Sequence, residues 1–220
     1  MQDQKCVETI AEMMTILTQL SLSTGIGLTK NQRKQGAIII LPGHDEKWRV
    51  TKGIRFWQDT KIKHLLIAGT RGDSGFEKND IALDIGKKST FIKLGQGRMV
   101  ASEKTEIKLG GYCANTEDQM LWLVDCLNDN DLEIDYLILA TAAHHSPRCW
   151  LTCLQVLKTN KIYNLKLFVK PLCDPENPIL SADKILEEAK KIEAYRAKGD
   201  VASVDDLREY FKWFKGECAI

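Results

Sequence analysis

The strongest constraint on the fold is a repeated pattern in which a short apolar run is followed by a turn and then by a helical pattern. In the clearest case, residues 136–140 (Tyr-Leu-Ile-Leu-Ala) are apolar throughout, as in a strand buried on both faces of a parallel sheet. Ser146 and Pro147 then open a helix, because serine is a preferred N-cap and proline suits the first helical position. Apolar residues continue at helical spacing as Trp150, Leu151, Leu154 and Leu157.

The same pattern recurs along the middle of the chain. Further strands are predicted at 37–41, 64–68, 106–109 and 166–169, and helices at 47–59 and from 116 to about 127. Such alternation predicts an α/β fold, a Rossmann-like three-layer sandwich with a mostly parallel sheet of about five strands. Within residues 74–104 we expect a short helix near Asp80, a short strand at 91–94 and a mobile flap around Gly95 and Gly97.

Helical patterns also flank this core, at 4–21, 182–197 and 204–215, with Ser181 and Ser203 as caps of the last two. We therefore expect a single domain over residues 1–220, with a core at about 37–170 and helical additions at 1–25 and 180–220. The charged faces of the C-terminal helices are interpreted as solvated surface.

Composition argues against several classes of function. The 31 basic and 30 acidic residues nearly cancel, which gives no electrostatic reason to expect nucleic acid or an anionic membrane as a partner. No apolar run approaches the roughly 20 residues that span a bilayer, and the acidic N-terminal region is unlike a secretory signal. The seven cysteines form no CxxC pair, and Cys149 and Cys153 are interpreted as small buried thiols. A reducing, cytoplasmic setting is expected.

Polar residues and glycines follow the predicted strands where ligands bind in open α/β sheets, at the carboxyl ends. A lone histidine in a loop is more often solvated, and a lone arginine more often caps a carboxylate. Their combination at a strand-to-helix joint favours a binding site instead, because a helix N-terminus attracts anions. The single glycines match neither a dinucleotide fingerprint nor a P-loop. The candidates in these turns are Gly43, His44, Arg49, Gly69, Thr70, Thr141, His144, His145 and Arg148.

A further candidate group is Asn115-Thr116 with Asp118 and Gln119, at the start of the helix that follows residue 115. Thr116 and Gln119 have the spacing of a capping box, in which each side chain satisfies a backbone amide of the other residue. Alternatively, Asn115 and Asp118 face the ligand crevice. The local sequence supports both interpretations.

Taken together, these motifs resemble the YdcF/SanA/ElyC-like family of bacterial proteins over roughly residues 37–169. The resemblance rests on Ile-Ile-Ile-Leu-Pro-Gly43 before Arg49, on Leu-Leu-Ile-Ala-Gly69, on Asn115-Thr-Glu-Asp-Gln119 and on Ala140-Thr-Ala-Ala-His-His-Ser-Pro-Arg148. The family's His-x-x-Arg maps to His145 and Arg148. Here Asp118-Gln119 replaces the family's Glu-Asn, and His44 replaces a glycine. An acidic position of the family has no secure counterpart, Glu77 being the best match, and Gly110-Gly111 occupies another position that is often acidic. The resemblance implies a polar pocket for a nucleotide-like or phosphate-bearing ligand, including one like S-adenosylmethionine.

Three functions remain open at this stage. In the first, the protein is a hydrolase or transferase acting on a small phosphorylated or nucleotide-like molecule. Arg49 and Arg148 then clamp the anion, Asn115 binds the ligand, His145 is the acid or base, and Asp118 orients His145 or holds a divalent metal. In the second, the same residues hold a nucleotide or S-adenosylmethionine without turnover. In the third, the helical ends (1–21 and 182–220) bind a partner protein as an adaptor.

Overall fold

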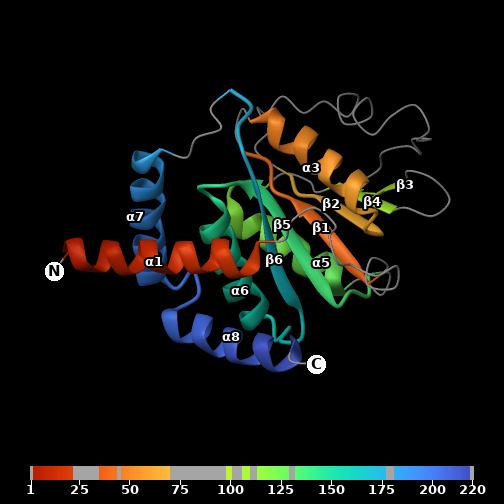
Figure 1. Cartoon of the computed structure of the whole chain (residues 1–220). Coiled ribbons are helices and arrows are strands. Elements are labelled where there is room, and N and C mark those ends of the chain that lie inside the picture. The colour runs from red at the N-terminus through yellow and green to blue at the C-terminus, as the bar shows by residue number, and fades with distance from the viewer. Residues whose placement is uncertain are drawn as a thin grey trace.

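The computed structural model describes residues 2–21, 35–43, 46–69, 98–100, 106–109, 113–128, 132–176 and 181–218. Helices and strands alternate through the middle of these ranges, with helices at both ends of the chain (Figure 1). The expected helix near Asp80 and the expected strand at 91–94 lie outside the described residues, as do Gly95, Gly97 and the two glycines at 110 and 111.

A six-stranded sheet in the order β3-β4-β2-β1-β5-β6 forms the centre (Figure 1). Four of the six strands, β2, β1, β5 and β6, run parallel to one another. The structure describes the side chains of these four strands. Strand β4 extends the sheet in parallel, and β3 pairs antiparallel with β4 at the edge. The predicted α/β class and mostly parallel sheet are confirmed; β3 was not predicted. The strands are β1 Gly36–Ile40, β2 His64–Ile67, β3 Arg98–Val100, β4 Glu106–Leu109, β5 Tyr136–Ala142 and β6 Lys166–Leu172.

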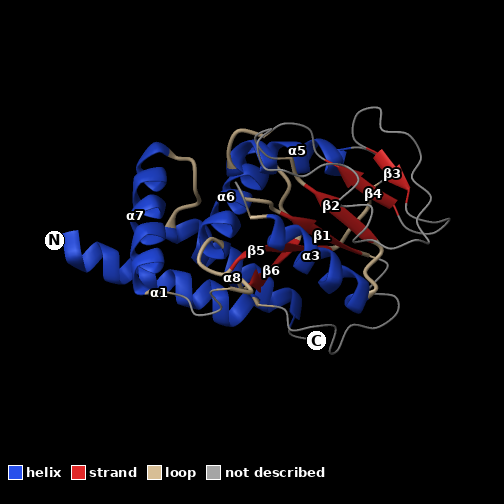
Figure 2. Ribbon diagram, turned by 90° about the horizontal axis from the view of Figure 1, so that it is seen from above, coloured by secondary structure: helices blue, strands red, loops and turns tan. Residues whose placement is uncertain are grey.

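Helices cover both faces of the sheet, which gives the predicted three layers (Figure 2). Alternate residues of β1 point to opposite faces: Ile38 and Ile40 pack with the α3 side, whereas Ile39 packs with Trp150 of α6. Every residue of β1, β2 and β5 is buried, which explains why their sequences are apolar apart from His64 and Thr141. The covering helices are α3 Lys47–Thr60 on one face, and α5 Thr116–Asn128 and α6 Ser146–Thr159 on the other.

The predicted terminal helices are also present, as α1 Gln2–Leu20, α7 Ala182–Lys198 and α8 Val204–Cys218. Helix α1 packs against α6, β6 and α7. The hydroxyl of Ser181 accepts a hydrogen bond from the amide of Lys184, and that of Ser203 accepts one from Asp206, so both predicted caps are confirmed. Among the described helices, none is both long enough and apolar enough to cross a bilayer.

Strand order defines where a ligand site should lie. From β1 the chain passes to β2 and β4 on one side, and then returns to β5 and β6 on the other side of β1. The sheet order therefore reverses between β1 and β5, and the crevice at the carboxyl ends of two such strands is where open α/β sheets bind ligands.

Candidate functional site

A polar pocket of about 500 Å³ lies at this reversal point. Its volume is within the range of roughly 300–1,000 Å³ found for small-molecule sites. The residues immediately before three helices all line it: Glu46 before α3, Asn115 before α5 and His145 before α6. The complete lining is Pro42, Gly43, Glu46, Arg49, Cys113, Ala114, Asn115, Thr116, Gln119, His144, His145, Arg148, Glu188 and Lys191.

Seven of the residues predicted from the sequence line this pocket: Gly43, Arg49, Asn115, Thr116, His144, His145 and Arg148. Thr141 lies beneath it, fully buried, where its hydroxyl donates to the carbonyl of Leu41 and accepts from Nη1 of Arg49 at 3.2 Å. Gly69 does not line the pocket. Its carbonyl accepts a hydrogen bond of 2.9 Å from Gln119, and Gln119 does line the pocket. The predicted sites at His44 and Thr70 lie outside the described residues.

The predicted capping box of Thr116 and Gln119 at the start of α5 is wrong. Asn115 caps the helix, because its Oδ1 accepts from the amide of Asp118 at 2.9 Å. The carboxylate of Asp118 in turn accepts from the amide of Ala114 at 2.8 Å. Thr116 is thereby left to contact His145, and Gln119 donates to the carbonyls of Pro42 and Gly69, tying α5 to the ends of β1 and β2.

The start of α6 also differs in detail from the prediction. His145 is the residue that precedes the helix, and Ser146 is already its first residue. The Ser146 hydroxyl donates to the carbonyl of Ala142 at 3.0 Å and does not cap the helix. Pro147 in the first turn has no amide proton to leave unpaired, which is why it suits this position.

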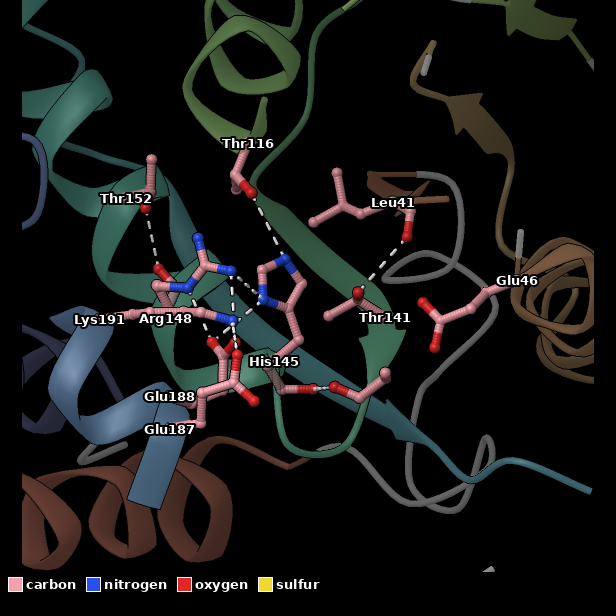
Figure 3. A network of polar contacts seen from close by, with 12 residues as sticks. Leu41, Glu46, Thr116, Thr141, His145, Arg148, Thr152, Glu187, Glu188 and Lys191 are labelled. Carbon is pink, nitrogen blue, oxygen red and sulfur yellow. Dashed lines mark hydrogen bonds and ion pairs between the residues drawn. The ribbon is translucent and has the colours of Figure 1, made fainter. Parts of the chain in front are cut away.

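His145 is the centre of the polar network shown in Figure 3. Its Nδ1 lies 2.8 Å from Nη2 of Arg148 and 3.3 Å from a carboxylate oxygen of Glu188, and its Nε2 lies 3.4 Å from the Thr116 hydroxyl. Arginine only donates, so the shorter contact assigns the lone pair to Nδ1 and the proton to Nε2. Burial lowers the pKa of His145 to about 4, and the charge of Arg148 acts in the same direction. The neutral imidazole therefore presents an N–H group next to Thr116.

Glu188 of α7 is the carboxylate that contacts His145, which is the role predicted for Asp118. It accepts from Nε of Arg148 at 2.7 Å and from Nζ of Lys191 at 3.2 Å, and it is only 4% exposed (Figure 3). Burial alone raises the pKa of a carboxyl, but the contacts with His145 and Arg148 outweigh it, so the pKa of Glu188 lies well below its usual range. Arg148 thus pairs with a carboxylate of the protein itself.

Glu188 and Lys191 were missed because the charges of this helix were predicted to be solvated. One signal was present: Ile185, Ala189 and Ile192 mark the face of α7 that packs on the core, and Glu188 falls on that same stripe. A carboxylate at an apolar position of a helix needs a partner, because an unpaired buried charge is costly.

A second cationic centre is Arg49 on α3, which is 5% exposed and forms an ion pair with Glu46. Burial lowers the pKa of Arg49, and Glu46 offsets part of the effect; an arginine stays protonated nevertheless. Among the described residues, its Nε has no hydrogen-bond partner. A Cβ atom on Gly43 would lie 2.8 Å from the guanidinium carbon of Arg49, so the glycine after β1 is what allows the arginine to lie so close to the backbone.

The described residues do not form a metal centre: no three of their His, Cys, Asp or Glu side chains are grouped to hold an ion. Burial raises the pKa of Cys149 to about 12, and it raises the pKa of Cys153 as well, which supports their interpretation as unreactive core thiols. What the site offers is three cations, Arg49, Arg148 and Lys191, against the two carboxylates of Glu46 and Glu188.

Comparison with known proteins adds no family to this description. No model of a protein family and no curated protein matches the sequence.

Proposed function

We propose that the pocket at the ends of β1 and β5 binds a small phosphate-bearing or nucleotide-like molecule. The observation that carries the proposal is the set of three cations around one pocket into which the N-terminal ends of α3, α5 and α6 open. Helix N-termini favour anions, and guanidinium groups match the geometry of phosphate oxygens. The resemblance to the YdcF/SanA/ElyC-like proteins supports the same class of ligand.

The balance of charges favours one phosphate group over a chain of several. Glu188 already neutralises Arg148, and Glu46 neutralises Arg49, so among the residues that line the pocket one positive charge, that of Lys191, is in surplus with both histidines neutral. Exposed Glu187, which is outside the lining, also pairs with Lys191 at 2.6 Å. In this proposal Arg49 and Lys191 hold the phosphate. Asn115, Thr116 and the Nε2–H group of His145 orient the rest of the ligand by hydrogen bonds.

The screen that tests binding is thermal unfolding with inorganic phosphate, sugar phosphates, nucleotides, S-adenosylmethionine and divalent metals. A ligand at 100 times its dissociation constant stabilises the folded protein by about 2.7 kcal/mol, which raises the melting temperature of a chain of this size by about 5–11 °C. Lys191→Gln and Arg49→Gln should weaken the stabilisation by phosphate compounds. Arg208→Gln, an exposed arginine on α8, is the matched control and should not. Absence of any phosphate-dependent shift refutes the proposal, and capture of a protein through α1 and α8 would then favour an adaptor.

A second candidate function is turnover of the same ligand by a hydrolase or transferase. The contact between Glu188 and Nδ1 of His145 favours it, because the carboxylate would hold a proton on Nδ1 in the other tautomer of the ring, whose Nε2 then accepts a proton from the ligand. A phosphatase and nucleotide-hydrolase assay on the wild type and on His145→Gln tests it. Turnover that is lost in the variant while phosphate binding persists supports catalysis, whereas binding without turnover in the wild type leaves a binding module.

A further inference from the structure

A second, smaller pocket of about 130 Å³ adjoins the main one. The two share Asn115, Thr116 and Arg148, so they meet at these three residues. Beyond these residues the small pocket is lined by Glu117, Thr152, Tyr195, Asp200 and Val201. We call it the side pocket.

The chemistry of the side pocket is the opposite of that in the main pocket. Its charged groups are the carboxylates of Glu117 and Asp200 against the single cation Arg148, whose guanidinium carbon lies 5.4 Å from the centre of the Tyr195 ring. Two carboxylates repel a second phosphate. They accept hydrogen bonds well, and a carboxylate that receives sugar hydroxyls is a recurrent way of recognising ribose. Tyr195 and Val201 supply apolar surface beside these acceptors.

Asp200 is held in place by the backbone around it. Helix α7 ends at Gly199, whose φ of 84° is in the left-handed region that glycine adopts without strain. The amide of Asp200 then donates to the carbonyl of Tyr195 at 3.0 Å, and that of Ala202 donates to Leu151 of α6 at 3.1 Å. A carboxylate on a turn fixed at both sides is preorganised for a ligand, which reduces the entropy lost on binding.

The volume of the side pocket limits what enters it. An engineered cavity of about 150 Å³ accommodates one benzene molecule. A space of about 130 Å³ therefore accepts one five- or six-membered ring, and not a sugar together with a nucleobase.

We infer that the side pocket binds the hydroxyl-bearing sugar ring of a ligand whose phosphate lies in the main pocket. The inference rests on the proposed function and narrows its substrate class to sugar phosphates, either free or as the ribose phosphate of a nucleotide. Asp200 and Glu117 accept hydrogen bonds from the ring hydroxyls, and Arg148 lies between the sugar and the phosphate.

Calorimetric titration of the full chain tests this with four compounds: inorganic phosphate, ribose 5-phosphate, 2-deoxyribose 5-phosphate and AMP. The wild type should bind ribose 5-phosphate at least tenfold more tightly than inorganic phosphate and the deoxy compound. Asp200→Asn should lose about tenfold of the ribose 5-phosphate affinity and keep that for inorganic phosphate, because hydrogen bonds to a charged group are the stronger ones. Glu117→Gln is a second variant with the same expectation. Asp125→Asn, an exposed carboxylate on α5 outside both pockets, is the control.

Each outcome separates the two proposals. Phosphate binding without preference for the sugar, or with equal loss of both ligands in Asp200→Asn, overturns the side pocket and leaves the proposed function intact. Unchanged binding of ribose 5-phosphate in both variants also overturns it. Failure of inorganic phosphate and of every phosphate compound to bind overturns the proposed function itself. If the inference holds, tighter binding of AMP than of ribose 5-phosphate identifies a nucleotide, and equal binding a free sugar phosphate.

Discussion

Mild acid should destabilise this protein through one buried side chain, His145. An unfolded chain protonates this histidine at a pKa of about 6.5, whereas in the folded protein burial and the nearby Arg148 lower its pKa to about 4. Between these two values the unfolded state binds a proton that the folded state does not. The free energy of unfolding therefore falls as the pH falls through this window, and the penalty is absent above pH 6.5.

The size of the effect follows from the two pKa values. One pKa unit corresponds to about 1.4 kcal/mol, so His145 accounts for a loss of about 1.6 kcal/mol between pH 6.5 and 5, and the total approaches about 3.4 kcal/mol only well below pH 4. Glu188 acts in a lower range. Its folded pKa is depressed, so the stability it contributes is present above the unfolded value of about 4.3 and is lost below it. The interval from pH 5 to 6.5 thus separates the titration of the histidines from that of Glu188.

Urea denaturation at closely spaced pH values measures this slope. His145→Gln should remove most of it, because glutamine does not titrate. The matched control is His144→Gln: His144 is half-buried, and its pKa is also lowered by burial, so that variant should lose a smaller part of the slope. Wild-type and His145→Gln profiles that run parallel from pH 5 to 6.5 would show that His145 is protonated as easily in the folded state as in the unfolded chain, and the reasoning would be refuted.

Three further predictions concern the groups around the pocket. Glu188→Ala should lower the free energy of unfolding by about 3 kcal/mol, because it leaves Arg148, whose side chain is 14% exposed, without its carboxylate. Calorimetry should show a melting temperature about 6–12 °C lower, and a wild-type melting temperature would contradict the ion network. Gly43→Ala places a Cβ 2.8 Å from the guanidinium carbon of Arg49 and closer still to a carboxylate oxygen of Glu46, so both flexible side-chain ends must shift. Phosphate affinity measured by titration should fall about threefold because Arg49 moves from its place at the phosphate; unchanged affinity would show that Arg49 does not hold the ligand. Glu46→Gln should raise phosphate affinity about threefold, because Arg49 no longer pairs with a carboxylate of the protein; this equals ~0.7 kcal/mol, the range of a partly exposed ion pair. Weaker binding in this variant would show that Glu46 supports the ligand.

The sequence allowed prediction of those parts of the fold that depend on local patterns. Uninterrupted apolar runs identified β1, β2 and β5, because a strand covered on both faces has no polar side to display. Residues such as Gly43 and His145 could be assigned to one pocket, because parallel strands bring their carboxyl ends to the same edge of the sheet.

The remainder depends on contacts between distant segments or on competition among neighbouring hydrogen bonds. Glu188 reaches Arg148 across 40 residues, and no local pattern specifies that α7 docks beside α6. At the start of α5, Asn115 and Thr116 are both good caps, and the choice of Asn115 frees Thr116 for a histidine 29 residues away. Propensity alone does not rank two such alternatives.

The position of Glu188 on α7 has a consequence for how this chain can be shortened. A fragment ending at residue 176 would retain every strand of the sheet and both arginines of the pocket. It would nevertheless lose the acid that neutralises Arg148, together with Lys191. Ribosomal synthesis meets the same constraint, since the nascent protein has no finished binding site until α7 has emerged and docked.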